Sequence, residues 1–304
     1  MSSSVSSGPT RLQAWILAAR PRTLTAAAAP VVLGTGLALG RGWFAPLPAA
    51  AALLGALLIQ IGTNLANDYY DHLRGGDTEE RVGPLRVTQA GLIPPATVRG
   101  GAFGVLGLAL LLGVYLAWVG GWPIVILGLA SLVSAVAYTG GPFPLAYHGL
   151  GDLFVFLFFG LGAVGGTYWV QALELGPEVL LAGAGMGALS TAILVVNNLR
   201  DIETDARAGK RTLAVRLGRA GTKLEFLLLL ILGLGIPPVG MALLGWSPWT
   251  LLALGAALPA LSPARTVMAF APATDPRTLI PALGGTAQAA GLFGLLLGVG
   301  LALG

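Results

Sequence analysis

The chain has 304 residues, of which 55% are hydrophobic and 10% are charged, with a mean hydropathy of +0.81 and a net charge of +4. Because soluble domains carry about 25% charged residues, this composition excludes an ordinary soluble enzyme, and no nucleic-acid partner is expected. The sequence contains no cysteine, which excludes disulfides, thiolate metal ligands and a cysteine nucleophile.

Residues 1–13 are expected to form a polar N-terminal arm, and residues 14–304 a single membrane domain. The arm is rich in serine and lacks the charged-then-apolar order of a signal peptide. Beyond it, apolar segments alternate with glycine, proline or charge, and a bilayer crossing needs about 20 apolar residues. They predict an all-α, polytopic membrane protein of about nine transmembrane helices, which begin near Trp15, Ala49, Gly100, Trp122, Leu150, Glu178, Leu224, Trp249 and Leu279.

Basic residues fall on one side of the predicted helices. Every Lys and Arg except Arg41 lies in the N-terminal arm, near the first helix start or in loops of the same side, and the positive-inside rule places that side in the cytoplasm. Two of these loops, Asp71–Val98 and Asp201–Thr222, are long and charged, so they are expected to cap the bundle. Most glycines, such as those of Gly34–Gly40 and Gly183–Gly187, are expected to let helices pack closely.

The second predicted helix ends in a polar face. Asn64, Asn67, Asp68 and Asp71 fall at i, i+3, i+4 and i+7, and therefore lie on the same side of the helix. A glycine pair then ends the helix, and Asp77 follows in the loop. Carboxylates near membrane depth are costly and indicate function.

The sixth predicted helix ends in the same way, with Asn197, Asp201 and Asp205 at i, i+4 and i+8. Two acidic faces that meet would repel unless a cation lay between them. Mg²⁺, with Mn²⁺ as an alternative, is the predicted cofactor, because it binds carboxylate and amide oxygens and shares them with substrate phosphates. A solvated charged loop would not need asparagine repeated at helical spacing.

Basic residues near both faces are suited to phosphate oxygens. Arg74, Arg81, Lys210 and Arg211 are the candidates within the two long loops. Arg22 begins the first helix, where a contact with phosphate and an anchor among lipid headgroups are equally expected. Tyr138 is expected at the membrane interface, although it would also be placed to line the site.

The strings Asn67-Asp68-Tyr-Tyr-Asp71 and Asp201-x-x-x-Asp205 resemble the two Asp-rich motifs of the UbiA superfamily of intramembrane aromatic prenyltransferases. The resemblance spans nearly the whole chain. It implies that Asp68, Asp71, Asp201 and Asp205 are catalytic and bind the metal. It also implies that the diphosphate is bound by Asn64, Asn67, Asn197, Arg22, Arg81, Lys210 and Arg211. The family's first motif often has a further Asp where this chain has Gly75, and Asp77 is expected to take over as a metal ligand from the loop.

Longer strings narrow the resemblance to the 1,4-dihydroxy-2-naphthoate prenyltransferases of menaquinone synthesis; they are Ala19–Thr25, Gln60–Asp71, Gly76–Arg81, Arg86–Leu92 and Asn197–Thr212. This implies transfer of a polyprenyl group from its diphosphate to that naphthoate, with loss of CO₂ and diphosphate, to give demethylmenaquinone. It also implies a bacterial cytoplasmic (inner) membrane location and no obligate protein partner.

Two alternatives remain open at this stage. A related prenyltransferase would act on another aromatic acid, such as 4-hydroxybenzoate or homogentisate. A secondary transporter also carries acidic residues in broken helices, but its acids should lie near the middle of the membrane.

Overall fold

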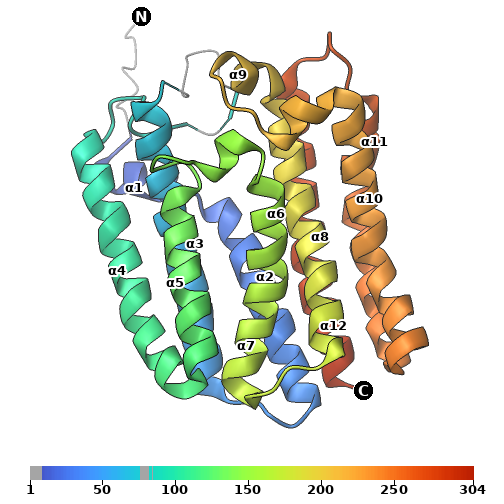
Figure 1. Cartoon of the computed structure of the whole chain (residues 1–304). Helices are drawn as coiled ribbons and strands as arrows, with labels where there is room; N and C mark the ends of the chain where they lie inside the picture. The colour runs from blue at the N-terminus through green and yellow to red at the C-terminus, as the bar shows by residue number, and fades with distance from the viewer. Residues whose placement is uncertain (1–8, 76–81, 84) are drawn as a thin grey trace, which may run out of the picture.

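The computed structural model describes residues 9–75, 82–83 and 85–304, and within these residues every regular element is helical. The helices lie side by side in one bundle, with α1 and α9 toward one end and the C-terminus at the other (Figure 1). We call the end that carries α9 the polar end.

Eight helical segments of the described residues are long and apolar enough to cross a membrane, and α5 adds a ninth apolar helix of 16 residues. The predictions of an all-α membrane bundle and of about nine helices are therefore confirmed. The nine are α2 (Pro21–Gly40), α3 (Pro46–Leu73), α4 (Pro95–Gly120), α5 (Trp122–Ala137), α6 with η2 and α7 (Gly151–Ala172), α8 (Pro177–Arg200), α10 (Leu213–Leu244), η3 with α11 (Pro248–Ala269), and η4 with α12 (Pro276–Ala302).

Shorter elements lie at the polar end: α1 (Arg11–Ala19), η1 (Leu145–His148) and α9 (Ile202–Arg207). Several of the long helices carry proline in their first turn, among them α2, α3, α4 and α8. Proline is well tolerated there, because the N–H that it lacks has no partner within the helix.

The first predicted helix, which was expected to begin near Trp15, is divided in two at Arg20. A proline disfavours helical torsion angles in the residue before it, and Arg20, which precedes Pro21, has φ 51° and ψ 70°. The Asn64 side-chain amide donates a hydrogen bond of 2.9 Å to the carbonyl oxygen of Ala19 and so holds the break.

One boundary drawn from the sequence was wrong. The predicted loop Asp201–Thr222 contains α9 and the first turns of α10, which departs from helical geometry only at Gly218, with φ 67°. The helix α1 begins at Arg11, inside the segment predicted to be an arm, while residues 1–8 lie outside the described residues.

Glycine allows the close helix packing that the sequence predicts. A Cβ atom on Gly160 would lie 2.5 Å from the carbonyl oxygen of Gly183 and 2.6 Å from Cα of Gly187, so α8 and the π-helical segment η2 (Phe156–Gly162) touch through their backbones. Most of the buried core surrounds α8 and involves α2, α10 and α12. A smaller core joins α1, α3 and α4.

Candidate active site

A cavity of about 1220 Å³ lies inside the bundle. Near the polar end it is lined by amide and carboxylate side chains, which come from α3 and from the junction of α8 with α9. Farther from that end its walls are apolar and belong mainly to α3, α4, α5 and α7. The polar lining includes Asn67, Asp71, Asn197, Asp201 and Asp205.

Asp71 lies near the end of α3 and is buried, with two partners. The Nη2 atom of Arg86 donates to its Oδ2 at 2.8 Å, and the hydroxyl of Tyr147 donates to its Oδ1 at 3.1 Å. One turn earlier, the Oδ1 atom of Asn67 accepts a hydrogen bond from Thr139 at 2.9 Å. These contacts tie α3 to the segments that follow α5 and precede α4.

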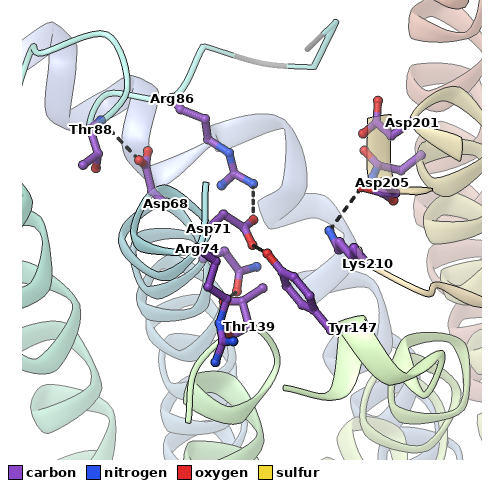
Figure 2. A network of polar contacts seen from close by, with 12 residues as sticks. Asp68, Asp71, Arg74, Arg86, Thr88, Thr139, Tyr147, Asp201, Asp205 and Lys210 are labelled. Atoms are coloured by element: carbon purple, nitrogen blue, oxygen red, sulfur yellow. Dashed lines mark hydrogen bonds and ion pairs between the residues drawn. The ribbon is translucent and has the colours of Figure 1, made fainter. Parts of the chain in front are cut away.

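Asp68 also lies on this part of α3, but it has different neighbours. Its Oδ2 accepts a hydrogen bond of 3.1 Å from the backbone N–H of Val87, and its Oδ1 accepts one of 3.2 Å from that of Thr88. Figure 2 shows its side chain directed toward Thr88 and away from Asp205. Asp68 does not belong to the cavity lining, so its role as a metal ligand stays a prediction.

The second acidic group forms where α8 ends. Asp201 follows the last residue of α8, and its carboxylate accepts two hydrogen bonds, of 2.7 and 2.6 Å, from the guanidinium of Arg200. Arg200 also donates to Oδ1 of Asn197 at 2.9 Å. Asp205 lies one turn later on α9, and Gly209, with φ 71°, turns the chain so that Lys210 returns to within 3.7 Å of it.

The two acidic groups face each other across the polar end of the cavity, with Tyr147 and Lys210 between them (Figure 2). Among the described residues, no three His, Cys, Asp or Glu side chains lie close enough to hold a metal ion by themselves. This arrangement fits Mg²⁺, which is usually bound by one or two carboxylates together with substrate phosphates. Asp71 on one side, and Asp201 with Asp205 on the other, would each supply one or two carboxylates, and oxygens of the diphosphate would complete the coordination.

Tyr147 is placed by η1 and contributes a phenol to the site. Burial raises the pKa of its hydroxyl, and the neighbouring Asp71 carboxylate raises it further. The phenol is therefore neutral at physiological pH and donates to Asp71. The Nζ atom of Lys210 and Cζ of Arg74 lie 5.7 and 5.4 Å from the centre of the Tyr147 ring, close enough for cation–π attraction.

The remaining predicted residues are divided between the cavity and its surroundings. Arg22 and Lys210 line the cavity, whereas Arg211 is exposed and outside its lining. Asn64 lines the cavity but uses its amide N–H groups on Ala19 and Thr23. The predicted residues Asp77 and Arg81 lie outside the described residues.

Sequence reasoning did not assign roles to three residues at this end: Arg86, Tyr147 and Arg200, all of which line the cavity. Arg200 lies between Asn197 and Asp201 in the string Asn197–Thr212, and no role was predicted for it. Arg86 begins the string Arg86–Leu92, which carried the resemblance without a role. Tyr147 lies in an irregular loop, where no periodicity indicates the direction of a side chain. Tyr138, expected at the membrane interface, also lines the cavity.

Comparison with known proteins gives consistent matches along the chain. A sequence model of the UbiA prenyltransferase family matches residues 27–282. The chain is 42% identical to the 1,4-dihydroxy-2-naphthoate octaprenyltransferase of Mycobacterium tuberculosis, over 95% of this chain and 97% of that protein. It is 39% identical to the protein of the same name from Escherichia coli, over 70% of this chain and 71% of the relative. The solved structure of a UbiA homolog from Archaeoglobus fulgidus bound to DMAPP and Mg²⁺ has the same fold, with a TM-score of 0.65 at 14% identity, over 92% of this chain and 98% of that one.

Proposed function

The chain belongs to the UbiA prenyltransferase family, and from that premise we propose that it transfers a polyprenyl group from a diphosphate to 1,4-dihydroxy-2-naphthoate. The observation that supports this most directly is the cavity, whose acidic end continues into an apolar chamber inside the bundle. A prenyl diphosphate is divided in the same way, into a charged head that binds metal and a long apolar tail. The relatives with 42% and 39% identity are 1,4-dihydroxy-2-naphthoate octaprenyltransferases, which favours the naphthoate as the acceptor.

Residues of the polar end would bind the diphosphate and help it to leave. A bound Mg²⁺ would supply positive charge against the charge that grows on the leaving diphosphate. Lys210 and Arg200 lie in the lining and would add cationic charge near the oxygens of the leaving diphosphate. The amide oxygens of Asn67 and Asn197 are held in place by hydrogen bonds from Thr139 and Arg200, and their amide N–H groups would be available to oxygens of the diphosphate.

The apolar walls would protect the allylic cation that forms when the C–O bond breaks. Their side chains come from helices that also face lipid, and a chamber without water suppresses capture of the cation by water. The cation then adds to the ring carbon that bears the carboxylate. The carbon–carbon bond to the carboxylate breaks, its electron pair returns to the ring, and CO₂ leaves. The product is the reduced, quinol form of demethylmenaquinone, and no base is needed to remove a ring proton.

The protein is a multi-pass membrane protein. We propose that its polar end faces the cytoplasm of a bacterial cell and that the bundle crosses the inner membrane. The distribution of basic residues supports this, because Arg41 alone among Lys and Arg lies at the opposite side in the predicted topology. The polyprenyl tail would then lie within the bilayer, and the aromatic acid would arrive from the cytoplasm.

Competition between acceptors tests the proposal. Membranes that contain the protein are given octaprenyl diphosphate, Mg²⁺, and equal concentrations of 1,4-dihydroxy-2-naphthoate and 4-hydroxybenzoate, and the products are identified by mass spectrometry. We expect the decarboxylated naphthoate product to dominate. A dominant benzoate product would leave the family and the metal in place and refute the acceptor. Absence of any prenylated product, beside an active relative prepared in the same way, would refute the transferase itself.

A further inference from the structure

The turn that precedes α4 is fixed by Asp68. The backbone N–H groups of Val87 and Thr88 both donate to this one carboxylate, at 3.1 and 3.2 Å. The carboxylate is buried, with Asp68 only 1% exposed, and Val87 is wholly buried in the small core beneath it. A buried carboxylate that accepts two backbone N–H groups forms strong, charge-assisted hydrogen bonds, so these contacts set the position of the turn.

The same turn is closed by its own backbone. The N–H of Ala90 donates to the carbonyl oxygen of Arg86 at 2.9 Å, and the N–H of Leu92 donates to that of Val87, also at 2.9 Å. Ile93 follows within the small core. The turn is therefore compact, and its position relative to α3 depends on Asp68, which contacts its first residues.

Arg86 stands immediately before the residues that Asp68 holds. It is buried, lines the cavity, and donates from Nη2 to Asp71 at 2.8 Å. Asp68 and Asp71 are three residues apart on α3, so the two carboxylates hold one turn in complementary ways (Figure 2). Asp68 holds its backbone, and Asp71 holds the side chain that reaches into the cavity.

This geometry gives Asp68 and Asp71 different chemical environments. Asp71 lines the cavity, where a metal and a diphosphate would be bound, while both oxygens of Asp68 face backbone amides outside the lining. Guanidinium groups bind phosphate oxygens through paired N–H donors. Arg86 places such a group beside Asp71, in the lining of the polar end.

We propose that Arg86 binds the diphosphate of the prenyl donor and that Asp68 is a positioning residue, which fixes the 86–92 turn and so directs Arg86 into the cavity. This inference rests on the proposed prenyl transfer. It assigns Asp68 an indirect role, in contrast to Asp71, and it gives the Arg86–Leu92 string a function.

Steady-state kinetics of the full-length protein in lipid nanodiscs test the proposal. Donor, acceptor and Mg²⁺ are varied in turn for the variants Arg86→Ala and Asp68→Asn and for the double variant. Thr88→Ala is the matched control, because it removes a buried side chain from the turn and keeps the backbone N–H that Asp68 binds. Asp71→Asn is the comparison for a metal ligand, and Asp68→Glu, which keeps a carboxylate on a longer side chain, is the second variant if Asp68→Asn does not accumulate.

We expect Arg86→Ala to lower kcat/KM for the donor by roughly 10- to 100-fold, as for loss of a hydrogen bond to a charged group. The KM of the acceptor should change little. Asp68→Asn should also lower kcat/KM for the donor and should leave the half-saturating Mg²⁺ concentration unchanged. Asp71→Asn should raise the half-saturating Mg²⁺ concentration. The double variant should be no more than about threefold worse than Arg86→Ala, because residues that act through one another are not additive. Thr88→Ala should resemble the wild type.

Three results would overturn the inference while the wild type remains active. A normal donor kcat/KM in Arg86→Ala would remove Arg86 from the diphosphate site, whatever the Asp68 variants do. A raised Mg²⁺ requirement in Asp68→Asn, equal to that of Asp71→Asn, would make Asp68 a ligand. Multiplicative losses in the double variant would show that the two residues act independently. An inactive wild type would instead refute the proposed function.

Discussion

Three glycines on neighbouring helices line the apolar part of the cavity: Gly55 on α3, Gly113 on α4 and Gly128 on α5. A Cβ atom at any of them would meet no other atom within 4 Å. Each would therefore project a side chain into open space, and that space is the cavity.

The contacts between the helices place these glycines at one level. Gly62 faces Leu106 where α3 packs on α4, and Gly55 and Gly113 each lie seven residues farther from the polar end along antiparallel helices. On the other side, Asn67 is hydrogen-bonded to Thr139, which follows α5. Gly55 precedes Asn67 by twelve residues on α3, which is about 18 Å at 1.5 Å per residue. Gly128 precedes Thr139 by eleven residues, which is about 17 Å along α5.

This depth sets the length of donor that reaches the glycines. An isoprene unit contributes four chain bonds where a peptide residue contributes three, so its extended length is about 5 Å. A tail of about four isoprene units would span the roughly 18 Å between the polar end and the glycine level. Longer tails must pass that level, and shorter ones end before it.

Replacing Gly113 by leucine therefore should discriminate between donors by length. Forcing extra methylenes into a filled site costs about 1–3 kcal/mol, which corresponds to roughly a 5- to 150-fold loss of kcat/KM. We expect this loss with octaprenyl diphosphate, and less than about a threefold change with geranyl diphosphate. The assay measures initial rates with each donor at a saturating concentration of the naphthoate.

Gly104→Leu is the matched control. Gly104 lies on the same helix, is exposed on the outside of the bundle, has no atom within 4 Å of a Cβ position and does not line the cavity. It should leave both donors unaffected. An equal loss with both donors in Gly113→Leu, or no loss with either, would refute the assignment of this part of the cavity to the tail.

Further predictions concern the polar end. The variants Asp71→Asn, Asp201→Asn and Asp205→Asn should each lower turnover at least about a hundredfold, a loss of roughly 2.7 kcal/mol in transition-state stabilisation; near-normal turnover in a folded variant would exclude that residue as a metal ligand. Lys210→Ala should raise the KM of the donor, because Lys210 lines the cavity, while Arg211→Ala should change it little, because Arg211 is exposed; the reverse order would exchange their roles. Excess EDTA should abolish turnover and added Mg²⁺ should restore it, and full activity in EDTA would contradict the metal requirement.

The sequence by itself determined the fold class and the kind of site. Long apolar segments must become helices in a membrane, since no water is present to satisfy their backbone groups, and the uneven distribution of basic residues indicates their orientation. Helical periodicity placed Asn64, Asn67, Asp68 and Asp71 on one face, and α3 carries them so. The helical fold and the shared face hold because they depend only on local geometry and on composition, while the orientation stays a prediction.

Tertiary structure alone decided what each of those side chains contacts. Asp68 and Asp71 share a face of α3, yet Asp68 holds a backbone turn and Asp71 reaches the cavity. Arg86 reaches Asp71 because the chain folds back on itself before α4. One face of a helix contacts several other segments of the fold, and periodicity does not tell which of these segments each residue contacts.

The same limit applies to the glycines of the apolar chamber. Nothing in the sequence distinguishes Gly113, which lines the cavity, from Gly104 on the same helix, because both are small residues in an apolar segment. Their difference arises from the packing of α4 against α3 and α5, which fixes the rotation of each helix and its height relative to the others. That arrangement depends on contacts between residues far apart in the chain, and these contacts form only when the whole bundle assembles.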